Sequence, residues 1–185
     1  PTPDMVYKVI KGSHVAHNSG ENEWYTPPDY IEAAKKVMGA IDLDPASSDR
    51  ANLIVQATIY YTAENDGLTK PWAGKVWMNP PYAAELITKF ISKFISHVTS
   101  GQITDGIVLV NNATETVWFR ELATSAEAIV FPSGRVRFLD PEGNPGAPLQ
   151  GQAVVYFGDD PELFLREFSR FGWGVLLWKT VNEGK

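Results

Sequence analysis

The chain has 185 residues, with 16 Lys and Arg against 22 Asp and Glu, so its formal net charge is −6. Hydrophobic residues make up 44% and charged residues 21%, a balance that fits one compact globular domain and excludes wholesale disorder. There is no cysteine, which excludes disulfides, zinc held by cysteine and any mechanism with a cysteine nucleophile. The acidic charge argues against a protein that coats nucleic acid without specificity, but it leaves room for a local basic patch.

The start of the chain differs in character from the rest. Residues 1–22 are polar and show little periodicity, so we interpret them as a flexible arm and residues 23–185 as a single domain. His14 and His17 in this arm have no third ligand nearby, and His97 lies near a helix end, so no metal site is expected. No apolar run approaches the ~20 residues that span a bilayer, and a reducing, cytoplasmic compartment is expected.

From residue 24 onward, predicted helices and strands alternate. Apolar residues at helical spacing, with caps, predict helices at residues 27–37, 47–55, 83–98, 114–124 and 161–171. Short apolar or β-branched runs predict strands at residues 40–46, 57–62, 75–78, 105–111, 128–131, 136–139, 153–157 and 175–178. Residues 140–151 form a loop rich in Pro and Gly. The alternation predicts an α/β domain with a mainly parallel, doubly wound sheet, and the closely spaced last strands predict an antiparallel edge.

The sharpest motif consists of Asn79, Pro80, Pro81 and Tyr82. It follows a predicted strand and precedes a helix, which places it at the carboxyl end of a strand, where doubly wound sheets bind ligands. The two prolines remove two N–H donors and leave two acceptors, the Asn79 side-chain oxygen and the Pro80 carbonyl. These acceptors suit a nitrogen that carries two hydrogens, and they would localise the lone pair of an amino group on a purine. Tyr82 offers a flat face on which a base can stack, and in that role its hydroxyl is idle.

Alone, this tetrapeptide is equally consistent with a simple strand-to-helix turn. Three other segments raise the odds of a functional site, although each also has an ordinary interpretation. The DPA segment at residues 44–46 ends a strand with an acid that can bind a positively charged or hydroxyl-bearing cofactor group, or can cap a helix. The DGL segment at residues 66–68 alone indicates a turn, and the YTP segment at residues 25–27 alone indicates a helix start.

The order of these motifs resembles one family. WYTP, DLDPAS, YYTAENDGL, PW, VWMNPPY and GQAVVYFG follow one another between about residues 23 and 171, as in the phage-type DNA N6-adenine methyltransferases. NPPY alone is shared by several methyltransferases that act on amino groups, and the ordered combination is more specific. The resemblance implies a Rossmann-like class I methyltransferase fold, S-adenosylmethionine as the cofactor, double-stranded DNA as the partner, no metal, and a phage or prophage origin.

The resemblance also implies roles for individual residues. Cofactor binding is expected of Tyr25, Thr26, Pro27, Asp44, Pro45, Ala46, Asp66, Gly67 and Leu68. The target base is expected to be held by the catalytic residues Asn79, Pro80, Pro81 and Tyr82, with Phe138 packed on the extruded base. The chain departs from the usual methyltransferase pattern at one place: residues 47–50 have the sequence SSDR, where most methyltransferases have a glycine-rich loop.

DNA contacts are expected from basic side chains. Arg135 and Arg137 are the better candidates, because alternate residues of a strand point the same way. The other candidates, for which a solvated surface is the simpler interpretation, are Lys70, Lys75, Lys89 and Lys93. Base reading falls to the loop at residues 140–151 and to the N-terminal arm.

The inferred reaction is direct transfer of a methyl group to the adenine N6 nitrogen after base flipping, without a covalent enzyme intermediate. The lack of cysteine excludes transfer to the C5 carbon of cytosine by a cysteine nucleophile. Three alternatives stay open: methylation of RNA, methylation of a glutamine amide in a protein, and a non-catalytic module that binds DNA or the cofactor. The altered loop at residues 47–50 keeps the last alternative open, and the intact NPPY argues against it.

Overall fold

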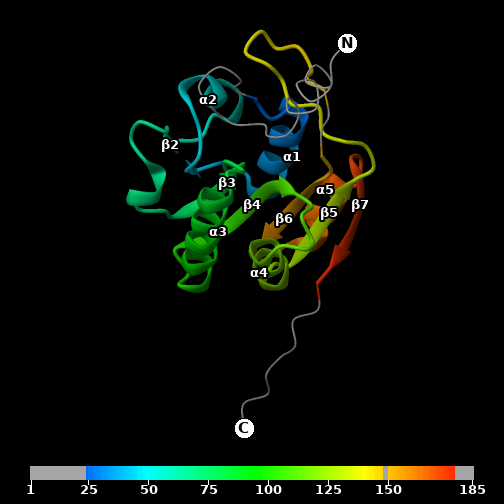
Figure 1. The fold of residues 1–185 in the computed structure, drawn as a ribbon. Coiled ribbons are helices and arrows are strands. Elements are labelled where there is room, and N and C mark those ends of the chain that lie inside the picture. The colour runs from blue at the N-terminus through cyan, green and yellow to red at the C-terminus, as the bar shows by residue number, and fades with distance from the viewer. Residues whose placement is uncertain (1–23, 148–149, 178–185) are drawn as a thin grey trace, which may run out of the picture.

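The computed structural model describes residues 24–147 and 150–177. Its strands form one sheet of seven strands in the order β2-β1-β3-β4-β6-β5-β7 (Figure 1). The strands are β1 (Leu43–Asp44), β2 (Ile59–Tyr60), β3 (Gly74–Met78), β4 (Ile103–Asn111), β5 (Ala128–Pro132), β6 (Gln152–Phe157) and β7 (Gly172–Leu176). The division into an arm at residues 1–22 and a domain at residues 23–185 stays a prediction, because the arm lies outside the described residues.

The sheet has a parallel part and an antiparallel part. The pairs β1–β2, β1–β3 and β3–β4 are parallel, whereas β6 is antiparallel to both of its neighbours, β4 and β5. It follows that β5 runs in the same direction as β4. β7 pairs antiparallel with β5 and forms the edge. The predicted α/β fold with a mainly parallel sheet and an antiparallel edge is confirmed, and the antiparallel part extends inward to include β6.

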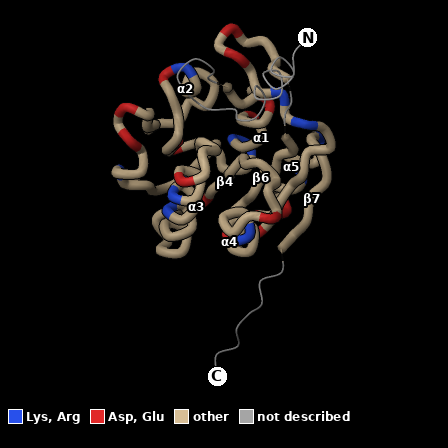
Figure 2. The backbone as a smooth tube through the Cα atoms, viewed as in Figure 1, with Lys and Arg blue, Asp and Glu red and all other residues tan. Residues whose placement is uncertain are grey.

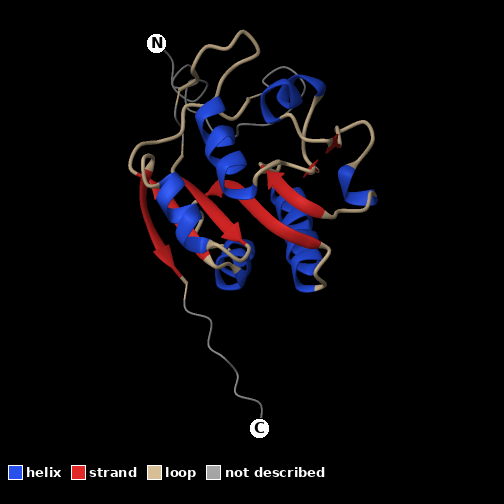
Figure 3. Ribbon diagram, turned by 180° about the vertical axis from the view of Figure 1, so that it is seen from behind, coloured by secondary structure: helices blue, strands red, loops and turns tan. Residues whose placement is uncertain are grey.

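Helices cover both faces of the sheet (Figure 3). They are α1 (Pro28–Met38), α2 (Asp49–Val55), α3 (Ala84–Thr99), α4 (Val117–Ser125) and α5 (Pro161–Phe168), with a short 3-10 turn, η2 (Gly67–Thr69). The alternation of side chains along β4 supplies both cores: Ile107 and Leu109 pack with α1, α2 and α5, whereas Val108 and Val110 pack with α3 and α4. The central strands of the sheet are therefore buried on both faces, as their apolar residues predict, whereas most of β7 at the edge is exposed. Within the described residues, no helix is both long enough and apolar enough to cross a membrane.

The ends of the helices follow from capping side chains. The predicted cap of α2 is confirmed at Ser48, whose Oγ accepts a hydrogen bond from the Ala51 N–H at 3.1 Å. α4 begins at Val117, later than the predicted residue 114, because the Thr116 side chain accepts from the Phe119 N–H at 3.3 Å and fixes the start there. The predicted helix at residues 161–171 is also shorter and ends at Phe168.

The predicted strand at residues 136–139 is wrong. Both sides of β5 are already taken, by β6 and by β7, so the segment that follows β5 cannot fold back and pair with it. It leaves the sheet, and only Leu139 forms isolated bridges, to Tyr25 and to Pro145. The argument that Arg135 and Arg137 point the same way as alternate residues of a strand therefore fails.

One edge of the sheet collects polar residues from several strands. Asp44 ends β1, Asn79 follows β3 directly, and Asn111 ends β4. Because β6 runs in the opposite direction, it begins at this same edge, where Gln152 pairs with Asn111. These four residues define what we call the carboxyl-end edge, which means the side of the sheet at which the parallel strands end and not an outermost strand. Ligands bind at this side in sheets of this kind.

Candidate active site

Asn79 is held at both ends of its side-chain amide. Its Oδ1 atom accepts a hydrogen bond from the Tyr82 hydroxyl at 2.9 Å, and its Nδ2 atom donates to Thr26 Oγ1 at 3.4 Å. Asn79 is half-buried and Pro80 is buried, so the backbone below the amide is fixed as well. The structure thus brings Thr26, from the segment before α1, to the NPPY motif that follows β3.

The Tyr82 hydroxyl lies among three acceptors. They are Asn79 Oδ1 at 2.9 Å, Gln152 Oε1 at 3.2 Å and the Leu109 carbonyl at 3.4 Å. Burial raises the pKa of Tyr82 above its ordinary value, so the hydroxyl stays protonated and acts as a donor. The hydroxyl is therefore a hydrogen-bond donor in the folded protein, and whether it is idle in the reaction stays a prediction. The ring is half-buried against the apolar cluster shared with α3 and α4, and stacking of a base on it stays a prediction.

Gln152 and Asn111 are site residues that the sequence reasoning missed. Gln152 is only 5% exposed, and its Nε2 atom donates to Asn111 Oδ1 at 2.6 Å. The signal in the sequence was a single amide at the start of an otherwise apolar or aromatic strand, QAVVYF. A buried amide in such a strand needs partners, and here they lie at the carboxyl-end edge.

Asp44 is a buried carboxyl at the end of β1, with 3% of its surface exposed. Burial raises its pKa to about 7, although hydrogen bonds from the Ala46 N–H, at 3.2 Å, and from the Ser47 side chain act in the opposite direction. Neither of the two salt bridges found among the described residues involves Asp44. Its environment therefore lacks the positive charge that would favour the ionised form, and it suits a cationic ligand.

The turn at residues 66–68 packs directly on the segment at residues 44–46. Asp66 Oδ1 accepts from the Leu68 N–H at 3.1 Å and starts η2. A Cβ atom added to Gly67 would lie 2.1 Å from the Pro45 carbonyl oxygen, so glycine is needed for this close approach. The buried Trp72 side chain also fixes this turn, because its Nε1 atom donates to the Gly67 carbonyl at 2.8 Å. Two segments expected to bind the cofactor are thus in contact.

Two lysines expected on the DNA surface are used inside the protein. Lys93 Nζ donates to the carbonyl oxygens of Leu68, at 2.7 Å, and of Lys70, and it lies 4.9 Å from the centre of the Trp72 ring. Lys75 Nζ donates to the Met38 carbonyl. Both ammonium groups therefore stabilise turns of the chain itself and are not simply solvated, and phosphate contacts of Lys75 and Lys93 stay a prediction.

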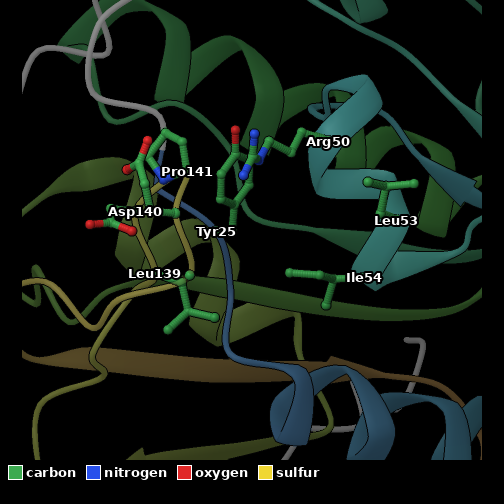
Figure 4. A pocket seen from close by; sticks show the side chains of 9 residues that line it. Tyr25, Arg50, Leu53, Ile54, Leu139, Asp140 and Pro141 are labelled. Carbon is green, nitrogen blue, oxygen red and sulfur yellow. The ribbon is translucent and has the colours of Figure 1, made fainter.

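A cavity of about 220 Å³ lies beside Tyr25, between α2 and the loop that follows Phe138 (Figure 4). Its walls are Tyr25, Arg50, Leu53, Ile54 and residues 139–143. Tyr25 is buried and exchanges two backbone hydrogen bonds of 2.8 Å with Leu139, which fix the loop against the segment before α1. Figure 4 shows the Arg50 side chain extending from α2 towards Tyr25. The residues of the NPPY motif do not line this cavity.

The residues expected to contact the base and the DNA are less closely gathered. Phe138 packs half-buried against the cluster of α1, α2 and α5, whereas Tyr82 packs against the cluster of α3 and α4. Arg135 and Arg137 are exposed on the segment that leaves the sheet after β5.

Across residues 24–147 and 150–177, no group of His, Cys, Asp and Glu side chains is arranged to hold a metal ion. His14 and His17 lie outside the described residues.

The sequence matches the family model of the DNA N-6-adenine-methyltransferases (Dam) over residues 12–155. This match covers more than three quarters of the chain and includes every segment of the carboxyl-end edge. The chain belongs to the Dam family. The resemblance seen in the sequence is therefore confirmed, and the family is that of the methyltransferases that act on the adenine N6 of DNA. A search of curated proteins gives no match to it.

Proposed function

We propose that this Dam methyltransferase transfers a methyl group from S-adenosylmethionine to adenine N6 in double-stranded DNA, after the base has left the helix. The observation that carries the proposal is the fixed side chain of Asn79 at the carboxyl-end edge. Its oxygen and the Pro80 carbonyl are acceptors on a backbone from which the prolines have removed donors.

In the proposed reaction, Asn79 Oδ1 and the Pro80 carbonyl each accept one hydrogen of the N6 amino group. Two acceptors outside the plane of the base draw the nitrogen towards a tetrahedral shape and make its lone pair available. They also stabilise the positive charge that develops on the nitrogen during transfer. Pro81 keeps this backbone rigid and Tyr82 offers part of its ring to the base, so the reaction needs no covalent enzyme intermediate.

The chemistry of the surrounding residues fits S-adenosylmethionine. The cofactor carries an ammonium and a sulfonium group, and the buried Asp44 carboxyl has no cationic partner among the described residues. When bound, the cofactor supplies an electrophilic methyl group. We assign its methionine end to Tyr25, Thr26 and Pro27, with Asp44, Pro45 and Ala46 beneath it. The close packing of Gly67 on Pro45 supports a joint site in which Asp66, Gly67 and Leu68 lie near the adenine end.

The DNA surface in this proposal is small. Among the described residues, Lys and Arg are spread over several elements of the fold (Figure 2). Arg50, Arg135 and Arg137 are exposed near the cavity and on the segment after β5, and they would contact phosphates. Phe138 would pack on the extruded base, and the loop that begins at residue 139 would read the neighbouring bases.

A methyl-transfer assay tests the proposal. Labelled S-adenosylmethionine is incubated with the protein and, in parallel, with duplex DNA, RNA and a protein extract. We expect label in duplex DNA, recovered after digestion as N6-methyladenine, and no label in RNA or in protein glutamine. Label in RNA or glutamine would support a different substrate. DNA binding without any transfer would indicate a non-catalytic module.

A further inference from the structure

The single hydrogen of the Tyr82 hydroxyl has more than one acceptor within reach. Asn79 Oδ1 is the nearest at 2.9 Å, Gln152 Oε1 follows at 3.2 Å, and the Leu109 carbonyl lies at a long 3.4 Å. A hydroxyl has one hydrogen, so it forms one strong bond as a donor at a time. In the free protein that bond goes to Asn79, the oxygen that the proposed reaction needs for the substrate.

Gln152 is arranged to present an oxygen, and not its amide nitrogen, to this hydroxyl. Its Nε2 atom donates to Asn111 Oδ1 at 2.6 Å, which directs Oε1 towards Tyr82. Both partners lie on strands that pair with each other, so the arrangement is rigid. Gln152 is 5% exposed, and a buried amide of this kind is costly unless its hydrogen bonds are made.

We propose that Gln152 is a positioning residue, which accepts the Tyr82 hydroxyl when the adenine amino group takes over the Asn79 oxygen. The inference rests on the proposed function. The hydroxyl hydrogen turns about the Cζ–O bond of Tyr82 from Asn79 Oδ1 to Gln152 Oε1, and no covalent bond forms or breaks. The buried hydroxyl thus keeps an acceptor at every stage, and Asn79 becomes available to the substrate at little cost.

A purely structural glutamine would behave differently from one with this role. If Gln152 only fills space, its loss and the loss of the Tyr82 hydroxyl act on activity independently. If Gln152 is the second acceptor, its loss leaves only the more distant Leu109 carbonyl as an alternative to Asn79 Oδ1. The hydroxyl then keeps one of the two lone pairs of the Asn79 oxygen occupied and weakens that oxygen as an acceptor for the substrate. Removing the hydroxyl as well then relieves the competition, so the two changes are strongly coupled.

A double-mutant cycle tests this role with Gln152→Met, Tyr82→Phe and the double variant. Met has a similar length but lacks the acceptor. We measure kcat and KM for duplex DNA, and the affinity for S-adenosylmethionine by calorimetry. We expect Gln152→Met to lower kcat/KM for DNA about tenfold, Tyr82→Phe to lower it about two- to threefold, and the double variant to match Tyr82→Phe. Cofactor affinity should not change in any of them.

Two further variants control the comparison. Gln102→Met makes the same chemical change on an exposed residue at the other end of the sheet, and it should leave kcat and KM unchanged. Gln152→Glu keeps an oxygen facing Tyr82, so it should retain more activity than Gln152→Met. Gln152→Leu, which also lacks an acceptor, replaces Gln152→Met in the cycle if that variant does not fold.

Several results would overturn the proposal. The first is a fold-loss of kcat/KM in the double variant that equals the product of the two single fold-losses. The second is normal kcat/KM in Gln152→Met, and the third is an equal fold-loss of kcat/KM in Gln152→Met and Gln152→Glu. Each of these leaves the proposed function in place, because the wild-type enzyme still methylates DNA. A wild-type enzyme that transfers no methyl group to DNA would overturn the proposed function and this inference with it.

Discussion

The backbone of Gly67 lies so close to the Pro45 carbonyl that a Cβ atom at residue 67 would come within 2.1 Å of its oxygen. The two residues belong to segments more than twenty positions apart in the chain, at the turn before β3 and at the end of β1. Their contact joins two of the three segments assigned to the cofactor. A substitution that displaces one of these two segments should therefore displace the other as well.

Gly67→Ala should weaken cofactor binding. The added methyl group meets backbone on the Pro45 side, and so the turn must shift away from the end of β1. A displacement of about 1 Å in a binding site costs on the order of tenfold to a hundredfold, and we expect a loss of affinity of this size in calorimetry with S-adenosylmethionine. Gly134→Ala is the matched control, because a Cβ there meets no atom within 4 Å. Equal affinities in both variants would contradict a cofactor site at this contact.

Asn79→Ala should lose about 10²–10³-fold in kcat, because it removes one preorganised acceptor and keeps the prolines and the Pro80 carbonyl. Affinity for the cofactor should persist, since Asp44 and Gly67 remain. Asn79→Asp keeps an oxygen acceptor and adds a negative charge that favours the developing positive charge, so partial activity is expected. Single-turnover methylation of duplex DNA measures both variants. Near-normal turnover in Asn79→Ala would show that NPPY is only a strand-to-helix turn without a catalytic role.

Asp44→Asn should change the pH dependence of stability. The pKa of Asp44 is raised from 3.8 to about 7 in the folded protein, so between these values the folded state holds a proton that the unfolded state has lost. This contribution to the free energy of unfolding therefore falls as the pH rises from about 4 to about 7. Asn does not ionise, so the free energy of unfolding of the variant does not fall over this pH range. Above pH 7 the difference in free energy of unfolding between variant and wild type should therefore have moved by several kcal/mol in favour of the variant, since one pKa unit corresponds to about 1.4 kcal/mol.

Urea unfolding at pH 4 and pH 8 measures this difference. The same substitution should weaken the binding of S-adenosylmethionine, because it removes the negative charge that faces the cationic ligand. In the wild type, the affinity should rise as the pH passes through 7 and the carboxyl ionises. Parallel stability profiles for the two proteins would contradict the raised pKa of Asp44, and equal cofactor affinities at pH 8 would remove Asp44 from the cofactor site.

The affinity for DNA should depend only modestly on salt. Each neutralised phosphate contributes a slope of about −0.9 to the logarithm of affinity against the logarithm of salt concentration, and three contacts give about −3. Arg50→Ala, Arg135→Ala and Arg137→Ala should each reduce the magnitude of the slope by about one. Lys36→Ala on α1, whose ammonium lies 3.9 Å from Glu167, is the control and should not change it. A slope near −8 in the wild type would show that the contact surface is larger than proposed.

Local patterns were sufficient to predict much of the edge that carries the site. An apolar strand followed by Asn79 and two prolines places the motif at a strand end, and the apolar spacing in α3 gives the buried face with Ile87, Phe90 and Ile91. Both follow from neighbours in the sequence. The cap at Ser48 could be predicted for the same reason.

Features that depend on the whole sheet could not be read in this way. The segment at residues 136–139 has the residues of a strand, but whether a strand forms depends on β6 and β7, which occupy both sides of β5. Lys93 has the pattern of a solvated helix residue, and only the fold places the carbonyl of Leu68 within its reach. Gln152 joins the site because β6 lies antiparallel between β4 and β5, an inner position that the predicted antiparallel edge did not include.

The position of β6 between β4 and β5 has a consequence for how the enzyme is made. β6 is the last of these three strands to be synthesised, yet it separates the other two, so they cannot close into a finished sheet before it arrives. Such pairing over long stretches of chain is slow to form. A nascent chain therefore carries NPPY long before the strand that bears Gln152 emerges, and methylation competence is acquired late in biosynthesis. During refolding, recovery of activity should lag behind recovery of helix content.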